Sequence, residues 1–286
     1  MLFYLQIIIL AIIQGACELL PVSSSAHVIV AEKLMGFDPT SPEMTMLLVM
    51  LHTGTMFAVI VYFWRSWKQD YFTSSTRRGN YVLQIVIATA FTGGVYYGLK
   101  TVIVKIFMRG VPHAEIENLF SNLPLIACAL AAAGVLIIWA GLREVKAGAD
   151  QELQTKHSIW IGIMQGFCLP FRGFSRSGST ISTGLLFGLP KRKVEEFSFA
   201  LGVVLTPAAI GQELHRLIKA HALSDHSWVL HQLGSSLLGM VFSFIAGLLA
   251  LKWLSRWLEN GQWKFFGFYC LVAAAGVLAV HFALPG

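Results

Sequence analysis

Long apolar runs separated by short polar segments make up most of this chain. A helix needs about 20 predominantly apolar residues to cross a bilayer. Runs close to this length occur at six places, and each predicts a membrane-spanning helix. These runs cover residues 44–64, about 81–99, 122–141, about 194–215, about 232–251 and about 265–284.

Two further apolar regions are each divided by a polar segment. Neither half of such a region is a good candidate to cross the bilayer by itself. The first region turns at Pro21–Ser25, and the second turns at Arg172–Ser177. Irregular backbone at membrane depth is tolerated only where it is buried in protein or lines a cavity. We therefore expect two re-entrant helix pairs with a site at their tips. The paired segments are residues 2–20 with 26–37, and residues 158–169 with 178–189.

The order of these segments divides the chain into two similar halves. Each half has one re-entrant pair followed by three spans, and the most polar segment, 142–157, lies between the halves as a linker. Because three is an odd number, the second half must enter the membrane inverted. Inverted repeats with broken helices are a known membrane architecture. We predict an all-α integral membrane protein with an inverted-topology repeat. Residues 1–286 form a single domain, and the two repeats cover about 1–141 and about 158–286.

Composition and charge favour a membrane protein over a nucleic-acid-binding one. Hydrophobic residues form 56% of the chain and charged residues 13%, against about 45–50% and 25% in soluble domains. The net charge of +6 is dispersed over short loops, so we expect no nucleic-acid partner. Thirteen of the 21 Lys and Arg residues fall in four loops, which we place in the cytoplasm, and six fall on the other side. Both termini are then expected outside. The four loops are 65–80, 142–157, 190–196 and 252–264.

The first polar stretch, residues 14–27, places ionisable and hydroxyl side chains at membrane depth. Glu18 is the clearest anomaly, because a charged group inside a bilayer is costly and is a functional candidate by default. Gln14 lies four residues earlier, on the same helix face. Two simpler interpretations stay open, in which Ser23 is an ordinary helix N-cap and His27 is a structural histidine. The serines at the start of the next segment are Ser23, Ser24 and Ser25, and His27 shares a face with Ser24.

The second polar stretch, residues 165–180, brings two guanidinium groups, Arg172 and Arg176, just before a helix. Glycines let backbone N–H groups approach a ligand, and a helix N-terminus favours an anion. Arginine binds phosphate through paired hydrogen bonds. These features predict a phosphate site. Arginines near a helix end can instead extend to the membrane interface, but this does not account for the hydroxyls beside them. The neighbouring small and hydroxyl residues are Gly173, Ser175, Ser177, Gly178, Ser179 and Thr180.

Together the two stretches suit phosphoryl transfer. Arginine and backbone N–H dipoles stabilise charge on a transferred group, and a serine hydroxyl attacks when a neighbouring base takes its proton. Either His27 or Glu18 is a candidate for that base. Gln14 and Glu18 are also candidates to hold a divalent cation through oxygen. One carboxylate and one amide form an incomplete set of ligands, so substrate phosphates and water would have to complete it.

These stretches resemble the two motifs of the bacterial undecaprenyl-pyrophosphate phosphatase family, the BacA type linked to bacitracin resistance. Gln14 through His27 matches the first motif completely. Gly173 through Thr180 matches the second, although Arg172 stands where the family usually has proline. The resemblance covers most of the chain. Its flanking segments are Leu51–Thr55, Val61–Phe63 and Glu196–Phe199, the last followed by Val204 in place of another family proline.

The resemblance implies hydrolysis of undecaprenyl pyrophosphate to undecaprenyl phosphate and orthophosphate with a divalent cation, Mg²⁺ or Ca²⁺. The implied partners are a polyprenyl pyrophosphate substrate and membrane lipids, and a homodimer is left open. The implied location is the bacterial inner membrane, with the active site toward the periplasm. By position, the catalytic set is Ser24 as nucleophile with His27, Glu18 and Arg176, and Gln14 joins Glu18 at the metal. The implied phosphate-binding set is Ser23, Ser25, Arg172, Gly173, Ser175, Ser177, Gly178 and Thr180.

Two other functions compete with a phosphatase. A transporter or flippase of an anionic isoprenoid lipid is the first, because inverted repeats with broken helices are typical of transporters. Glu18 and His27 beside a candidate nucleophile favour chemistry over transport. A phosphatidic-acid type of phosphatase is the second, and it ranks lower because no His-x-x-x-Asp follows Ser175.

Overall fold

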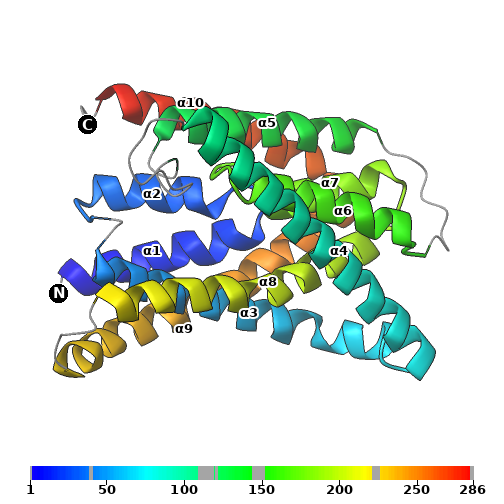
Figure 1. Cartoon of the computed structure of the whole chain (residues 1–286), viewed down its shortest axis with the longest axis horizontal. Coiled ribbons are helices and arrows are strands. Elements are labelled where there is room, and N and C mark those ends of the chain that lie inside the picture. The colour runs from blue at the N-terminus through cyan, green and yellow to red at the C-terminus, as the bar shows by residue number, and fades with distance from the viewer. Residues whose placement is uncertain are drawn as a thin grey trace.

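The computed structural model describes residues 2–38, 41–108, 119, 122–143, 152–220 and 226–283, and its regular elements are all helices (Figure 1). Within these ranges there are ten α-helices and one π-helical turn, η1. They are α1 Leu2–Leu19, α2 Ser24–Leu34, α3 Pro42–Asp70, α4 Ser75–Val102, η1 Ile103–Phe107, α5 Leu123–Leu142, α6 Thr155–Cys168, α7 Arg176–Leu186, α8 Lys191–Ala220, α9 His226–Glu259 and α10 Trp263–Ala283.

Six helices among the described residues are long and apolar enough to cross a membrane. Each overlaps most of one of the six predicted spans, which confirms the prediction of a multi-pass helical membrane protein. The candidate spans are Pro42–Asp70, Ser75–Ile106, Leu123–Leu142, Lys191–Gly211, Leu233–Glu259 and Trp263–Ala283.

Two of the predicted loops are wrong, because the helices continue beyond the apolar runs. The segment 65–80 is helical except for a turn at residues 71–74, and most of 252–264 belongs to α9 or α10. Charged residues at a helix end can extend into water without breaking backbone hydrogen bonds. Ser74 then starts α4 as an N-cap, where its Oγ accepts a hydrogen bond from the Arg77 N–H at 3.2 Å. The predicted linker 142–157 lies largely outside the described residues.

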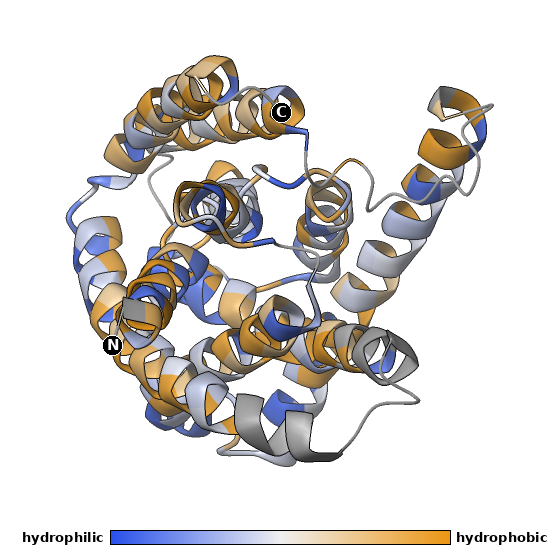
Figure 2. Cartoon of the chain, turned by 90° about the vertical axis from the view of Figure 1, so that its left-hand side faces the viewer, coloured by the Kyte–Doolittle hydropathy of each residue, from blue (hydrophilic) through white to orange (hydrophobic). Residues whose placement is uncertain are grey.

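Small residues let the long helices approach one another closely. A methyl group on Gly134 of α5 would lie 2.8 Å from the carbonyl oxygen of Gly267 in α10. A methyl group on Gly54 of α3 would lie 2.4 Å from the carbonyl oxygen of Met240 in α9. Such contacts suit a membrane, where van der Waals packing holds helices together. Apolar positions run along all the helices in the end-on view of Figure 2. Large hydrophobic side chains such as Val272, at 72% exposure, face outward, as expected toward lipid.

Two helical hairpins, α1–α2 and α6–α7, pack against the long helices, α1 mainly on α9 and α6 mainly on α4. Their second helices have only 11 residues each, about 16 Å of rise, which is too short to cross a bilayer. The two tips meet, since Ser177 Oγ donates to the Leu20 carbonyl oxygen at 3.5 Å. A methyl group on Gly178 would lie 3.2 Å from Pro21 Cβ. The start of α1 and the end of α10 lie at the same end of the molecule, on the left in Figure 1.

Candidate active site

The meeting of the hairpin tips brings three of the predicted catalytic side chains into contact. Ser24, the first residue of α2, donates a hydrogen bond from Oγ to Glu18 Oε2 at 2.5 Å. Arg176, the first residue of α7, donates from Nη2 to Glu18 Oε1 at 3.2 Å. Gln14 Nε2 donates to Glu18 Oε2 at 3.3 Å from one turn earlier on α1. The Glu18 carboxylate is therefore the centre of a polar cluster inside an apolar protein.

A strained residue, Ser23, sets the turn that makes this contact. It has a φ of 65°, in the left-handed region that costs an L-residue roughly 1–2 kcal/mol. Its side chain makes no capping hydrogen bond to α2, and its Oγ lies 3.4 Å from Ser25 Oγ instead. The interpretation of Ser23 as an ordinary side-chain N-cap is therefore wrong.

His27 makes hydrogen bonds with the Ser23 backbone and with α10. Its Nδ1 lies 2.8 Å from the Ser23 carbonyl oxygen, and its Nε2 lies 2.8 Å from the Tyr269 hydroxyl of α10. Because a carbonyl oxygen only accepts, Nδ1 carries a proton, and in the neutral ring Nε2 accepts from Tyr269. The two rings also stack at 5.6 Å. Of the two candidate bases, Glu18 is the one in contact with Ser24.

Arg176 is positioned by α8 as well as by Glu18. Its Nη1 donates to the Ser198 carbonyl oxygen at 3.4 Å, and Ser198 Oγ lies 2.6 Å from Thr180 Oγ1. A methyl group on Gly202 would lie 2.5 Å from Arg176 Nη1. Gly202 thus leaves the space that the guanidinium occupies, and a larger residue there would move the group away from Glu18.

The predicted phosphate-binding hydroxyls of the second stretch are buried and bonded within the protein. Ser175 is the N-cap of α7, where its Oγ accepts from the Gly178 N–H at 3.2 Å. Thr180 Oγ1 donates to the Arg176 carbonyl oxygen at 2.9 Å. Gly173, with a φ of 104°, lies so close to α5 that a methyl group would meet the Ile126 carbonyl oxygen at 2.3 Å. These residues shape the loop beneath Arg176.

Arg172, a predicted phosphate contact, has a different neighbour. It acts electrostatically on the carboxylate of Glu32, which is 1% exposed on α2. Glu32 lies eight residues beyond Ser24, about 12 Å further along the helix axis. Glu32 Oε1 has no hydrogen-bond partner among the described atoms. The structure thus gives Arg172 an electrostatic partner on α2, and its contact with phosphate stays a prediction.

Four residues without a predicted role complete the cluster. His52 Nε2 lies 3.9 Å from Glu18 Oε2, while its Nδ1 bonds the Leu48 carbonyl oxygen at 2.8 Å. Two of them, His52 and Ser198, lie in flanking segments that resemble the family, so the sequence did contain a signal for them. Gly202 and Tyr269 carried no signal, because each lies in an apolar run. The four residues are His52, Ser198, Gly202 and Tyr269.

The structure offers a partial set of metal ligands. Among the described residues, no group of three or more His, Cys, Asp or Glu side chains could hold a metal ion. Gln14 and Glu18 are in contact and could present two oxygen atoms to a hard cation. This donor set fits a divalent cation only if substrate and water oxygens supply the other ligands.

Fold and site together define an integral membrane protein with a serine–carboxylate–arginine cluster at the meeting point of two helical hairpins. The family model described as bacitracin resistance protein BacA matches residues 7–276. The chain belongs to this family. It is 57% identical over 284 residues to undecaprenyl-diphosphatase 2 of Acinetobacter baylyi, covering 96% of this chain and 97% of that protein.

More distant relatives cover nearly the same length. The chain is 34% identical over 281 residues to undecaprenyl-diphosphatase 1 of Burkholderia pseudomallei, with 93% of each chain covered. It has the same identity and coverage with undecaprenyl-diphosphatase 2 of Burkholderia thailandensis. The similarity therefore includes both hairpins and all six candidate spans.

Proposed function

We propose that this protein hydrolyses undecaprenyl pyrophosphate to undecaprenyl phosphate and orthophosphate, which recycles the lipid carrier of cell-wall synthesis and gives bacitracin resistance. Its relatives carry the name undecaprenyl-diphosphatase over almost their whole length. The observation that carries the proposal is the hydrogen bond from Ser24 to Glu18, with Arg176 on the other carboxylate oxygen.

In the first step, Ser24 attacks the terminal phosphorus of the pyrophosphate. Glu18 takes the hydroxyl proton as the bond from Oγ to phosphorus forms. The bond from that phosphorus to the bridging oxygen breaks, and undecaprenyl phosphate leaves with the electron pair. Arg176 stabilises the charge on the transferred group. Water then hydrolyses the phosphoserine, which releases orthophosphate and restores the serine.

The other members of the predicted site support this reaction. His27 holds the Ser23 carbonyl and so fixes the turn that presents Ser24. Gln14 and Glu18, with oxygens of the substrate, would hold a Mg²⁺ or Ca²⁺ ion. Such an ion, when bound, offsets the negative charge of the pyrophosphate. The remaining hydroxyls and glycines of the second stretch fix the loop from which Arg176 extends.

We further propose that the two hairpins are re-entrant pairs of an inverted repeat in the bacterial inner membrane. Each hairpin has a short second helix, and each is followed by three candidate spans. The start of α1 and the end of α10 share one end of the molecule, as the repeat requires (Figure 1). The excess of Lys and Arg in the opposite loops favours a periplasmic entrance to the site.

Orthophosphate release from a C55 isoprenyl pyrophosphate tests the activity. Purified wild type should release orthophosphate in the presence of divalent cation. Ser24→Ala should lose nearly all of this release, and Arg176→Lys most of it, because a lysine cannot contact Glu18 and Ser198 together. Thr73→Ala, an exposed change in the turn between α3 and α4, is the matched control. A folded wild type that binds the lipid without releasing orthophosphate would instead support a transporter.

A further inference from the structure

His52 of α3 faces the Glu18 carboxylate but makes no hydrogen bond to it. Its Nε2 lies 3.9 Å from Glu18 Oε2, which is beyond the range of a hydrogen bond. Among the described residues, this nitrogen has no other polar partner. The His52 side chain is 39% exposed, so solutes can reach the ring. The proposed reaction gives His52 no part.

The other ring nitrogen of His52 fixes where the proton lies. Nδ1 is 2.8 Å from the Leu48 carbonyl oxygen, one turn earlier on α3. A carbonyl oxygen only accepts, so Nδ1 carries a proton, and Nε2 of the neutral ring presents a lone pair. Metal-binding histidines usually donate their second N–H to a carbonyl or carboxylate in this way, which fixes the tautomer and the direction of the ring. The ring of His52 is therefore set up as a metal ligand.

Two groups that donate electron pairs thus face each other across 3.9 Å. Arg176 bonds the other carboxylate oxygen of Glu18, Oε1. Ser24 uses one lone pair of Oε2, and a carboxylate oxygen has a second. A divalent ion binds histidine nitrogen and carboxylate oxygen at about 2.0–2.2 Å, so one ion can bind two atoms about 4 Å apart. The gap between His52 and Glu18 is within reach of a single ion.

Gln14 brings the number of protein ligands to three. Its Nε2 lies 3.3 Å from Glu18 Oε2, one turn earlier on α1. A half-turn of the side-chain amide would place its oxygen at the same point, and amide oxygen is a suitable ligand for a divalent ion. The three ligands then come from α1 and α3, and oxygens of water or substrate complete the set.

A buried serine of α9, Ser243, contacts both of the helices that carry these ligands. Its Oγ donates to the carbonyl oxygen of Leu51, which precedes His52, at 3.0 Å. Its own carbonyl oxygen would lie 2.5 Å from a methyl group on Gly15, which follows Gln14. Ser243 is fully buried. The relative position of α1 and α3 is therefore fixed beside the ligands, and such support favours binding of an ion at a preformed site.

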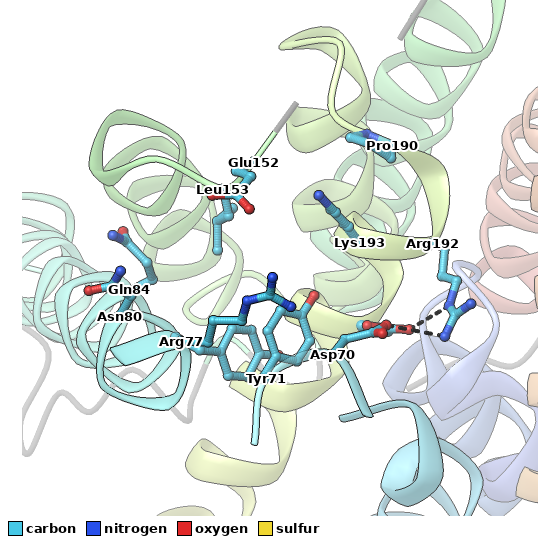
Figure 3. Close-up of a pocket in the computed structure, with 12 residues that line it drawn as sticks. Asp70, Tyr71, Arg77, Asn80, Gln84, Glu152, Leu153, Pro190, Arg192 and Lys193 are labelled. Atoms are coloured by element: carbon cyan, nitrogen blue, oxygen red, sulfur yellow. Dashed lines mark hydrogen bonds and ion pairs between the residues drawn. The ribbon is translucent and has the colours of Figure 1, made fainter. Parts of the chain in front are cut away.

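The polar pocket between the starts of α4 and α8 offers no comparable set of ligands. Arg192 makes hydrogen bonds of 2.8 Å to Glu196 and 3.2 Å to Asp70 there (Figure 3). These two carboxylates are thus neutralised by a guanidinium group. No histidine lies among the residues that line this pocket. An ion that takes nitrogen as well as oxygen is better served by His52 and Glu18.

We propose that His52, Glu18 and Gln14 form the protein side of a metal site that takes a first-row transition ion in preference to Mg²⁺ or Ca²⁺. Imidazole nitrogen is a good ligand for first-row transition ions, whereas Mg²⁺ and Ca²⁺ take oxygen ligands. The inference rests on the proposed function only for the presence of a divalent ion. It adds a nitrogen ligand from α3 and names the class of ion that the site holds best.

Electron paramagnetic resonance of Mn²⁺ tests this ligation without any measurement of activity. Full-length protein without a histidine tag would be titrated in detergent with Mn²⁺ alone, and loss of the free-ion signal gives the bound fraction. Electron spin-echo modulation then reports nitrogen nuclei bonded to the ion. We expect bound Mn²⁺ with nitrogen modulation, which changes when histidine is labelled with the heavier nitrogen isotope. Mg²⁺ should bind at least about tenfold more weakly than Mn²⁺.

Variants at position 52 separate a ligand from a structural residue. His52→Gln replaces the nitrogen ligand by an amide oxygen, so Mn²⁺ should still bind, but the nitrogen modulation and the preference over Mg²⁺ should be lost. His52→Ala should weaken Mn²⁺ binding by at least about tenfold. His281→Gln, an exposed change near the end of α10, is the matched control and should keep both affinity and modulation. Thermal unfolding without metal checks that each variant is folded.

Three results would overturn the proposal. They are bound Mn²⁺ without nitrogen modulation in wild type, modulation that is unchanged in His52→Gln, and no Mn²⁺ binding by folded wild type. The second result would assign the nitrogen to another histidine. Each can be told apart from failure of the proposed function, because orthophosphate release with Mg²⁺ or Ca²⁺ does not require a nitrogen ligand.

Discussion

The hydroxyl of Ser24 donates a 2.5 Å hydrogen bond to Glu18 across the turn that separates α1 from α2. The two residues are six apart, a spacing that a continuous helix would not bring into contact. The positive φ of Ser23 and the turn at Pro21 create the contact. Backbone strain at this point is thus associated with the pairing of a candidate nucleophile and a candidate base, in keeping with the way strain concentrates at active sites.

Replacing the carboxylate of Glu18 by an amide tests its role as the base. Glu18→Gln keeps the size of the side chain but cannot take the Ser24 proton, so we expect orthophosphate release to fall by about 10²–10⁴-fold. Glu259→Gln, an exposed change at the end of α9, is the control. Retention of more than a tenth of wild-type turnover by a folded Glu18→Gln protein would assign proton removal to another group, with His27 as the first candidate.

Adding one methyl group to Gly202 tests how strongly the activity depends on the position of the Arg176 guanidinium. The methyl group would lie 2.5 Å from Nη1, and the flexible guanidinium can move to relieve the contact. The protein should therefore fold normally, but the displacement should lower kcat by about 10–100-fold. Gly211→Ala on the same helix, where no atom lies within 4 Å, should have no such effect. Equal activities in the two variants would show that the site tolerates movement of Arg176.

Removing the hydroxyl of Tyr269 tests the support of His27. Tyr269→Phe keeps the stacked ring but deletes the hydrogen bond to Nε2. Loss of one neutral hydrogen bond should lower kcat/KM by about fivefold and should change the pH at which His27 titrates. The pH profile of kcat/KM is the measurement. An unchanged profile, matching that of the exposed control Tyr97→Phe, would mean that Tyr269 does not act on His27.

A double-mutant cycle tests the electrostatic interaction between Arg172 and Glu32. Arg172→Gln removes the cation that acts on the buried Glu32 carboxyl group, so we expect a loss of about 1 kcal/mol of stability. Glu32→Gln in the same protein should recover much of that loss, because the buried group is then neutral. Denaturant unfolding of wild type, the two single variants and the double variant gives the coupling free energy between Arg172 and Glu32. Additive effects would contradict the interaction and would return Arg172 to the list of possible phosphate contacts.

The sequence predicted the spans and the two hairpins because hydropathy reports contact with lipid. Hydropathy does not report where a helix ends, so α3 and α4 extend through the predicted loop at 65–80. Glu18 and Arg176 were predictable as partners, because polar groups inside a membrane are expected to find one another. Their contact joins residues 158 apart in the chain.

The rest of the site depends on tertiary packing that no local pattern records. Tyr269 lies in an apolar run and is 242 residues from His27, so its hydroxyl gave no signal. Gly202 is one of many glycines in the spans, and only the neighbouring guanidinium gives it a role. Arg172 was predicted to contact phosphate from its motif position, whereas the nearby carboxylate of Glu32 lies on a helix far away in sequence.

The most direct test of the account is the detection of a covalent intermediate on Ser24. Wild-type protein would be mixed with a C55 isoprenyl pyrophosphate and divalent cation, quenched in acid within one turnover, digested and analysed by mass spectrometry. The account predicts a phosphate on Ser24 that appears and decays at the rate of orthophosphate release, and that is absent from Ser24→Ala. Orthophosphate release without any phosphorylated Ser24, or with phosphate on Ser23 or Ser25 instead, would contradict it.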